Sequence, residues 1–404
     1  MYLTTVAKMV NPNLELLDKL GFISTKLYNT ANWERREAWE KTGKIPNYFE
    51  QCRTLKDNPW ARQLHSQSTQ AILGKLDESY KSWFKLRKTD DTSKPPGFRK
   101  KTSVSSIPFK KSAIRVTDQT IRLSMQPSMY KDRFYTFEYV SPVKLTEENL
   151  VKLELVKRDA SWYAHITYKK EPKPLKEEGG VKAIDLGVIH LATTINDDGT
   201  VKIYTGRDGL SIQRYFNKTI AHIQAKVMKR GKKWSNRLTE LSSKKTRQIK
   251  HLLHSITKAI VRDCIKENIK TVVLGDLSNI RKQGGGKAKS LGRTTNQKFH
   301  AWGFGQFTDQ LKYKLELEGI QVIQVSERNT SKTCSQCGYV ESYKGQCRKH
   351  RGLYICRHCG AKMHADVNGA LNILKKYLPE ASASWSSGCL AQPLVVAWNY
   401  GSLQ

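Results

Sequence analysis

The first 101 residues combine one strand-like stretch with two helical ones. Tyr2 to Met9 alternates apolar and polar residues as a strand does, whereas Leu14 to Trp39 and Trp60 to Trp83 place apolar residues at helical spacing. Residues 91–101 then break the helical pattern with two prolines and a glycine, and they carry four cations. The pattern predicts a strand, two core-facing helices and a basic loop suited to holding phosphate.

Short alternating runs from Ile107 to about Lys169 predict a small antiparallel β-barrel. The clearest runs are Ala113–Val116, Thr120–Leu123, Val151–Val156 and Trp162–Tyr168. The stretch from Lys170 to Gly180, with two prolines and two glycines, is typical of a linker. We therefore expect a domain boundary there.

The second half alternates strands with helices. Residues 211–268 form a basic helical pattern that Gly231 divides into a hairpin, and a loop rich in Gly and Lys, near substrate or simply solvated, spans Arg281 to Arg293. The remaining predicted elements are strands at Val181–Val188, Leu191–Ile195 and Thr271–Leu274, a helix at Phe307–Leu317 and a strand at Ile320–Val325. The strand-helix-strand order implies a parallel, right-handed crossover.

The charge balance narrows the class of partner. Lys and Arg number 70 against 36 Asp and Glu, which gives a formal charge of +34. Such a field attracts polyanions, and nucleic acid is the expected ligand, although a ribosomal-type or merely well-solvated basic surface has the same composition. A length of 404 residues suggests about two or three domains.

Hydropathy predicts an intracellular protein with no membrane partner. The first eight residues lack the apolar segment of a signal peptide. No stretch approaches the roughly 18 consecutive apolar residues that a membrane-spanning helix needs.

Four of the eight cysteines form two Cys-x-x-Cys pairs, Cys334 with Cys337 and Cys356 with Cys359, separated by 18 residues. This spacing is that of a zinc ribbon, whose four thiolates close the Zn²⁺ coordination sphere, so the metal would be structural. The other cysteines have no ligand spacing. Cys347 is expected at the tip of the finger, and Cys52, Cys264 and Cys389 are expected to pack as small hydrophobic residues.

Two aspartates are candidate metal ligands. Asp185 ends the first strand of the second half, where an RNase H-like fold carries an aspartate that bridges two divalent ions, but an Asp-Leu-Gly turn is also common for conformational reasons alone. Asp366 follows the second cysteine pair, and it could bind metal or cap the helix that begins at Val367.

Taken in order, four motifs resemble the TnpB family of transposon-encoded, RNA-guided nucleases, which is related to the compact type V CRISPR effectors. The motifs are Ala183–Gly187, Val273–Leu277, Thr330–Gly338 and Asp366–Ile373, and the Lys94–Arg99 loop extends the likeness into the first half. The resemblance implies a multidomain α/β plus β-barrel protein. It would have an RNase H-like (RuvC) nuclease domain with an inserted four-cysteine zinc ribbon, and an N-terminal wedge-type β-barrel with an inserted helical recognition domain.

Domain boundaries follow from this likeness and from the pattern. The expected parts are the wedge at 1–10 and 91–175, the recognition domain at 11–90, the nuclease domain at 176–329 and 362–380, the zinc ribbon at 330–361 and a flexible tail at 381–404. Apolar residues at 394–396 and 398 could dock part of that tail.

One position departs from the family's common pattern. The second metal-binding carboxylate usually precedes the Asp-Leu pair at the end of the strand, and here that place is Gly275. Glu327, just past the next parallel strand, is the proposed replacement, because neighbouring strands lie about 4.8 Å apart and a glutamate can span most of that distance. Asp276 is a second candidate, although its side chain should point to the opposite face, and Glu327 could instead pair with a cation.

The resemblance implies both chemistry and partners. Asp185, Glu327 and Asp366 would bind two catalytic Mg²⁺ ions, which activate water and stabilise the departing 3′ oxygen of a phosphodiester. A guide RNA from the transposon or locus would pair with one strand of double-stranded target DNA, while the protein reads a short adjacent motif. The protein would be cytoplasmic and nucleoid-associated, in a bacterium or archaeon.

Two other functions stay open. Gly275 motivates an RNA-guided DNA-binding repressor that does not cleave. A DNA-joining transposase also uses three carboxylates, but the placement of the ribbon and the four motifs argue against it.

Overall fold

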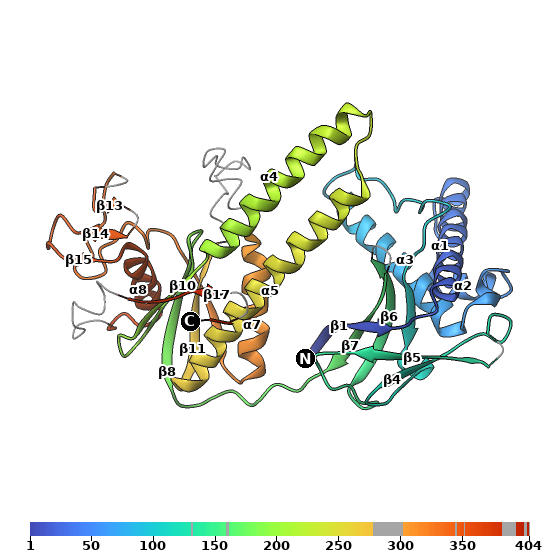
Figure 1. Cartoon of the computed structure of the whole chain (residues 1–404), viewed down its shortest axis with the longest axis horizontal. Coiled ribbons are helices and arrows are strands. Elements are labelled where there is room, and N and C mark those ends of the chain that lie inside the picture. Colours follow the sequence, from blue (N-terminus) through green and yellow to red (C-terminus); the bar gives the residue numbers. More distant parts are fainter. Residues whose placement is uncertain are drawn as a thin grey trace. The chain divides into compact units, whose positions relative to one another are not determined.

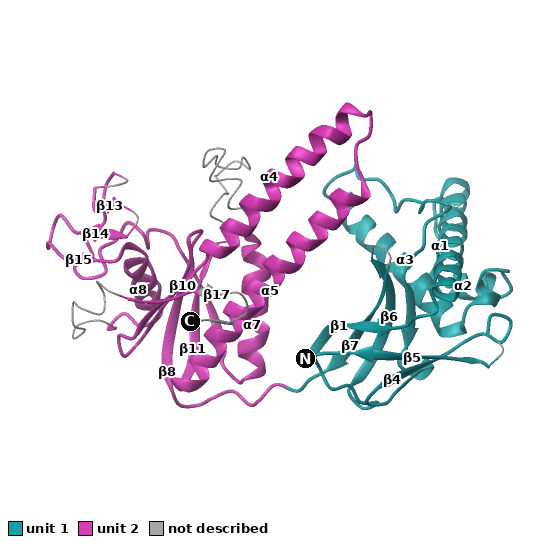
Figure 2. Ribbon diagram, viewed as in Figure 1, with its two compact units in different colours: residues 1–171 teal, residues 172–404 magenta. Residues whose placement is uncertain are grey.

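A computed structural model describes residues 1–130, 132–158, 161–277, 302–343, 346–350, 352–381, 393–399 and 402–403, the last two segments partly as backbone only. The chain forms two compact units, Met1–Glu171 and Pro172–Gln404 (Figure 2). Among the described residues, no helix has both the length and the apolar character needed to cross a membrane.

The first unit contains a seven-stranded antiparallel sheet with the order β2-β6-β7-β1-β5-β4-β3. Its strands are β1 (Tyr2–Val10), β2 (Ile107–Lys110), β3 (Ile114–Val116), β4 (Thr120–Ser124), β5 (Phe134–Val140), β6 (Leu150–Arg158) and β7 (Ser161–Lys169). The alternating runs of the sequence thus form strands, and β2 and β5 add to them. Closure of this sheet into a barrel stays a prediction.

Three helices lie between β1 and β2 in the sequence: α1 (Leu14–Thr42), α2 (Tyr48–Thr54) and α3 (Ser66–Arg87). Arg35 of α1 is fully buried and connects all three. Its Nε donates to Gln51 of α2 at 2.7 Å, and a terminal guanidinium nitrogen contacts the Asp77 carboxylate of α3 at 3.0 Å. This buried pair fixes the helices against one another.

The predicted phosphate loop packs against α1. The Pro96 carbonyl accepts hydrogen bonds from Asn32 and Arg36, and the Arg99 guanidinium lies 3.7 Å from the centre of the Tyr28 ring. Arg99 is therefore used in packing. The lysines at 94, 100 and 101 are exposed, and their binding of phosphate stays a prediction.

The second unit is built on a six-stranded mixed sheet with the order β12-β11-β8-β9-β10-β16 (Figure 1). Its strands are β8 (Gly180–Leu186), β9 (His190–Asn196), β10 (Val201–Thr205), β11 (Ile269–Asp276), β12 (Gln321–Ser326) and β16 (Leu394–Val396). The smaller strands are β13 (Arg348–His350), β14 (Leu353–Ile355), β15 (Lys362–Met363), β17 (Trp398–Asn399) and β18 (Ser402–Leu403). β11 pairs in parallel with both β8 and β12. The strand-helix-strand order predicted the pairing of β11 with β12.

Helices cover both faces of this sheet (Figure 1). α5 (Asn236–Lys266) and α7 (Phe304–Leu317) lie on one face and α8 (Ala365–Tyr377) on the other, whereas α4 (Arg207–Lys229) packs against α5. Ile184 and Leu274 pack with α5 and α7, whereas Ala183 and Val273 pack with α8. Side chains along β8 and β11 therefore alternate between the face covered by α5 and α7 and the face covered by α8.

Two further segments bear on the sequence predictions. Gly231, in the left-handed conformation at φ +69°, lies between α4 and α5 and makes the predicted helical hairpin. Residues 394–396 pair in parallel with β10 as the edge strand β16, which agrees with the docking that their apolar side chains suggested within the tail. The loop at 281–293 and Cys389 lie outside the described residues.

An ionic network anchors β8 to the end of α5. Lys182 is 1% exposed, and its ammonium lies 2.6 Å from Glu267, which also contacts Lys202 of β10 at 2.6 Å. Burial alone would raise the pKa of Glu267, but hydrogen bonds from Lys182, Lys202 and Asn196 lower it to about 2. The network holds β8, the strand that carries Asp185, to the end of α5.

We predict that Glu267→Gln lowers the free energy of unfolding by about 3 kcal/mol, because it leaves the buried Lys182 ammonium without an opposite charge. Urea denaturation at pH 7 measures the change. Glu171→Gln, which removes an exposed pair with Lys169, is the control and should change the free energy of unfolding far less. Equal effects of the two substitutions would contradict the role given to the network.

Candidate metal centre and zinc ribbon

A cavity of about 610 Å³ opens where the strands of the second unit end, and Asp185, Glu327 and Asp366 all line it. Asp185 lies near the end of β8, Glu327 follows the last residue of β12, and Asp366 is in the first turn of α8. Three segments far apart in the sequence thus bring their carboxylates to one place. Asp276 lines the same cavity.

Glu327 fills the space beside Gly275. A Cβ atom built on Gly275 would lie 2.1 Å from the Glu327 Oε1 atom and 2.7 Å from its Cγ atom. Gly275 follows Val273 by two positions, so this contact is on the face of the sheet that α8 covers. The carboxylate from the loop after β12 therefore occupies the position that a side chain at 275 would enter.

Glu327 has no ion pair within 4.0 Å and its buried Oε1 atom has no hydrogen-bond partner among the described residues. Burial, together with the negative charge of Asp276, raises its pKa to about 7, while Lys376 opposes that shift. A buried carboxylate oxygen without a partner is costly, and a bound cation would satisfy it. Among the described residues, no Lys, Arg or His forms an ion pair with Glu327, so the alternative that it simply pairs with a cation is not supported.

Asp185 is packed closely against α8. A Cβ atom on Gly369 would lie 2.7 Å from Asp185 Oδ2, so glycine at this helix position permits the approach. Burial is the main reason that the pKa of Asp185 lies well above its usual value, and the charges of Glu327 and Asp366 raise it further. Carboxylates that raise one another's pKa favour the binding of a divalent cation between them.

Asp366 is held by two cations or potential cations. Its Oδ2 atom lies 2.7 Å from His190 Nδ1, and its Oδ1 atom accepts a hydrogen bond from Arg348 at 2.7 Å. Burial alone would raise the pKa of Asp366, but His190 and Arg348 lower it below its usual value. The helix is capped by His364, whose Nδ1 accepts from the Asp366 N–H at 3.3 Å, so the capping role considered for Asp366 belongs to its neighbour.

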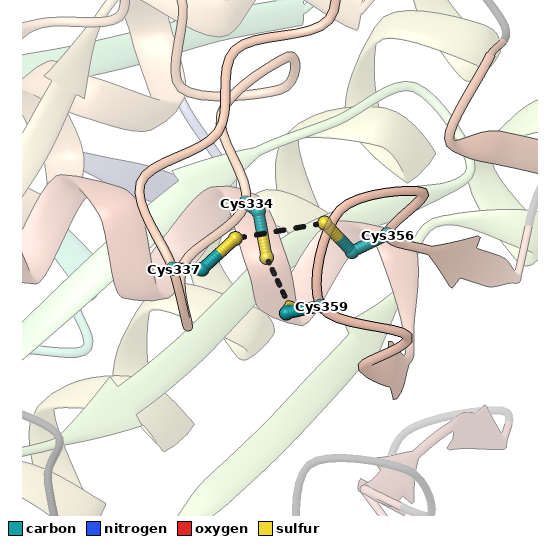
Figure 3. Close-up of side chains that lie close together, drawn as sticks. All are labelled: Cys334, Cys337, Cys356 and Cys359. Atoms are coloured by element: carbon teal, nitrogen blue, oxygen red, sulfur yellow. Dashed lines mark hydrogen bonds between the residues drawn. The ribbon is translucent and has the colours of Figure 1, made fainter.

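The four cysteines of the two pairs converge (Figure 3). The sulfur of Cys334 lies 3.8 Å from that of Cys359, and the sulfurs of Cys337 and Cys356 are 3.6 Å apart. Tetrahedral zinc with Zn–S bonds of about 2.3 Å separates its sulfur ligands by about 3.8 Å, so the cluster has the dimensions of a closed Zn²⁺ site. Cys347 is fully buried in the core beside α8, rather than at an exposed finger tip as expected.

Sequence patterns gave no signal for two neighbours of the carboxylates. His190 begins β9, and no periodicity or motif distinguishes it from other polar strand residues. Arg348 belongs to a basic stretch in the ribbon that was expected to be part of its finger. Their contacts with Asp366 depend on the ribbon and the sheet meeting at one edge of the cavity.

Comparisons with known proteins show two partial family matches and several relatives. A family model described as "Probable transposase" (OrfB_IS605) matches residues 165–281, and a "Cas12f1-like, TNB domain" model matches residues 304–373. The TnpB-like protein ORF457 of Acidianus two-tailed virus is 26% identical, over 89% of this chain and 83% of that protein. The chain is similar to TnpB-family proteins over most of its length. The family predicted from the four motifs is thus confirmed.

Other proteins similar to this chain are CRISPR effectors. The CRISPR-associated endodeoxyribonuclease Cas12f1 of Sulfoacidibacillus thermotolerans is 27% identical, over 54% of this chain and 50% of that protein. A Cas12f1 solved with an sgRNA and target DNA aligns with a TM-score of 0.62 at 17% identity, covering 89% of this chain and 82% of the other. That alignment shows a shared multidomain α/β fold.

The raised pKa of Glu327 predicts a pH-dependent stability in Mg²⁺-free buffer. The folded chain binds this proton more tightly than the unfolded chain, so the free energy of unfolding falls as the pH rises from about 4.5 to about 7. The free energy of unfolding of Glu327→Gln should therefore exceed that of the wild type by on the order of 2 kcal/mol at pH 8, and by much less at pH 5. Urea denaturation at both values measures the difference, and an equal gain at pH 5 and pH 8 would count against this account.

We predict one zinc ion per chain in purified protein, measured by elemental mass spectrometry. Cys356→Ser should lose it, because three thiolates and a hydroxyl bind zinc far more weakly than four thiolates. Cys52→Ser is the matched control, since Cys52 packs against the core of the first unit, and it should keep its zinc. Zinc retained by Cys356→Ser would show that these cysteines do not hold the metal.

Proposed function

We propose that this protein is an RNA-guided DNA endonuclease that hydrolyses phosphodiester bonds of double-stranded DNA beside a short adjacent motif. The observation that carries the proposal is the convergence of Asp185, Glu327 and Asp366 on one cavity, with the Glu327 carboxylate over Gly275. The relative Cas12f1 is named as an endodeoxyribonuclease, and a Cas12f1 is known in complex with an sgRNA and target DNA.

The three carboxylates fit Mg²⁺. All three offer oxygen, the donor that Mg²⁺ prefers, and one oxygen of Glu327 is buried without a partner among the described residues. Asp185, Glu327 and Asp366 would together hold these ions. Two such ions activate a water and stabilise the leaving oxygen in phosphodiester hydrolysis. The chain's own part is to hold Asp366 in place through His190 and Arg348.

Zn²⁺ would occupy the four-cysteine cluster and have a structural role. Four thiolates leave no coordination position open to a substrate. The ribbon also delivers Arg348 to Asp366, so its order bears directly on the carboxylate site.

In this proposal the second unit is an RNase H-like (RuvC) nuclease domain at 176–329 and 362–380 that carries the ribbon at 330–361. The mixed sheet, with β8 next to β11 and α8 on one face, supports it. The sheet of the first unit is proposed as the wedge at 1–10 and 91–175, and its helices as the recognition domain at 11–90.

Nucleic-acid partners follow from charge. A formal charge of +34 suits a guide RNA and target DNA, whose phosphates a protein can hold without reading sequence. The turn between α4 and α5 exposes cations and a tryptophan side by side, a combination suited to phosphate and base stacking: Lys229, Arg230, Lys232, Lys233 and Trp234.

A second candidate is a guide-directed repressor that binds without cutting, which Gly275 favours because it lacks the family's usual carboxylate. The two functions share every partner and differ only in hydrolysis.

Cleavage of a plasmid library, randomised beside a fixed target, decides between them. The protein is co-expressed with its flanking-locus RNA carrying a reprogrammed guide, and Mg²⁺ is supplied. We expect cut ends enriched for one flanking motif, reduced at least about 10³-fold in Asp185→Ala and in Glu327→Ala. Enrichment by binding with no cut ends would favour the repressor.

The Gly275 contact gives a sharper test of Glu327. Gly275→Ala puts a Cβ atom into the Glu327 carboxylate, so cleavage should fall by roughly 10-fold or more while binding of target DNA is kept. The exchange Gly275→Glu with Glu327→Gly returns a carboxylate to the family's common position and should restore part of the activity. Full activity of Gly275→Ala would contradict the assignment of Glu327.

A further inference from the structure

Three side chains on one face of α8 form a ladder along the segment 326–335. Asn368, Asn372 and Lys376 are spaced four residues apart, so they project from the same side of the helix. Their partners run in the opposite direction along the segment, which connects Glu327 to the first cysteine pair. We call these three residues the α8 ladder.

The first rung holds the zinc ribbon. Asn368 is fully buried, its Oδ1 accepts from the Ser335 N–H at 2.9 Å, and its Nδ2 donates to the Thr333 carbonyl at 2.9 Å. Ser335 follows Cys334 directly. Asn368 therefore fixes the backbone of the first cysteine pair on α8.

The middle rung reaches toward Glu327. Asn372 is 7% exposed, and its Nδ2 donates to the carbonyls of Thr330 at 2.8 Å and Thr333 at 2.7 Å. Thr330 in turn donates twice to the Glu327 carbonyl, from its N–H at 3.2 Å and from its hydroxyl at 2.9 Å. Thr330 thus links the side-chain amide of Asn372 to the backbone of Glu327.

The last rung brackets Glu327. The ammonium of Lys376 donates to the carbonyl of Ser326 at 2.5 Å and to that of Arg328 at 2.9 Å, the two residues on either side of the glutamate. Because the Glu327 Oε1 atom has no hydrogen-bond partner among the described residues, contacts to the backbone must set much of its position.

We propose that Asn372 and Lys376 are positioning residues for Glu327. They hold the loop that bears the Glu327 carboxylate at a fixed place relative to Asp366, which α8 itself carries. The inference rests on the proposed role of Glu327 as a metal ligand. A carboxylate on a strand is held by its sheet, whereas Glu327 lies beyond the end of β12 and needs another support. The ladder supplies it from the helix that also bears Asp366, and the same helix fixes the ribbon.

Binding of Mn²⁺, followed by electron paramagnetic resonance on the full chain, tests the ladder without requiring cleavage. We expect Lys376→Met and Asn372→Leu to raise the Mn²⁺ dissociation constant about tenfold, as loss of outer-shell support does. Lys376→Arg keeps donors at the same carbonyls and should bind Mn²⁺ like the wild type. Lys376 is exposed, so its variants should fold even if Asn372→Leu does not.

Thr257→Val is the control for a general loss of stability. It removes buried hydrogen bonds in α5, away from the cavity, and should leave Mn²⁺ affinity unchanged. Wild-type affinity in Lys376→Met, or an equal loss in Lys376→Arg or Thr257→Val, would overturn the proposal. Plasmid cleavage by the wild type tests the proposed nuclease separately. If the wild type does not cut but the α8 ladder variants still lose Mn²⁺ affinity as expected, only the nuclease is rejected.

Discussion

One steric exclusion governs the carboxylate site: Glu327 and a side chain at position 275 cannot occupy the same space. The overlap is severe, since a Cβ atom at 275 would lie 2.1 Å from Glu327 Oε1. Glycine at 275 is therefore a condition for the glutamate to reach the cavity, and the missing carboxylate and the arriving one are two sides of one arrangement. Gly275 considered without Glu327 would suggest that the carboxylate site had been lost.

Helix α8 is the frame on which the site is assembled. It carries Asp366 in its first turn and Gly369 against Asp185 in its second, and its side chains hold the loop that bears Glu327. The buried face of the same helix packs on the sheet through Val367, Ala370 and Leu371. Hydrophobic burial thus fixes the helix, and the helix sets the relative places of all three carboxylates. In this arrangement the ribbon is part of the site, since Arg348 and the first cysteine pair are both held to α8 or its aspartate.

Much of this organisation could be predicted from the sequence, because the signals were local or ordered along the chain. Paired cysteines at fixed spacing predicted the four-sulfur cluster, and apolar runs separated by a helix predicted the parallel pair of β11 and β12. Contacts made only in three dimensions were out of reach. The approach of His190 and Arg348 to Asp366, the burial of Cys347 and the pairing of residues 394–396 with β10 each depend on how distant segments pack. The position of Glu327 could be predicted in part. The spacing of neighbouring strands indicated that its side chain could reach the next strand, but only the structure shows its carboxylate over Gly275.

The most direct test of the central claim is the anomalous diffraction of Mn²⁺ in crystals of the protein. We predict Mn²⁺ peaks within coordination distance of carboxylate oxygens from Asp185, Glu327 and Asp366, and the Glu327 side chain still over Gly275. Peaks bound by Asp185 and Asp366 with Glu327 turned away, or by Asp276 in its place, would contradict it.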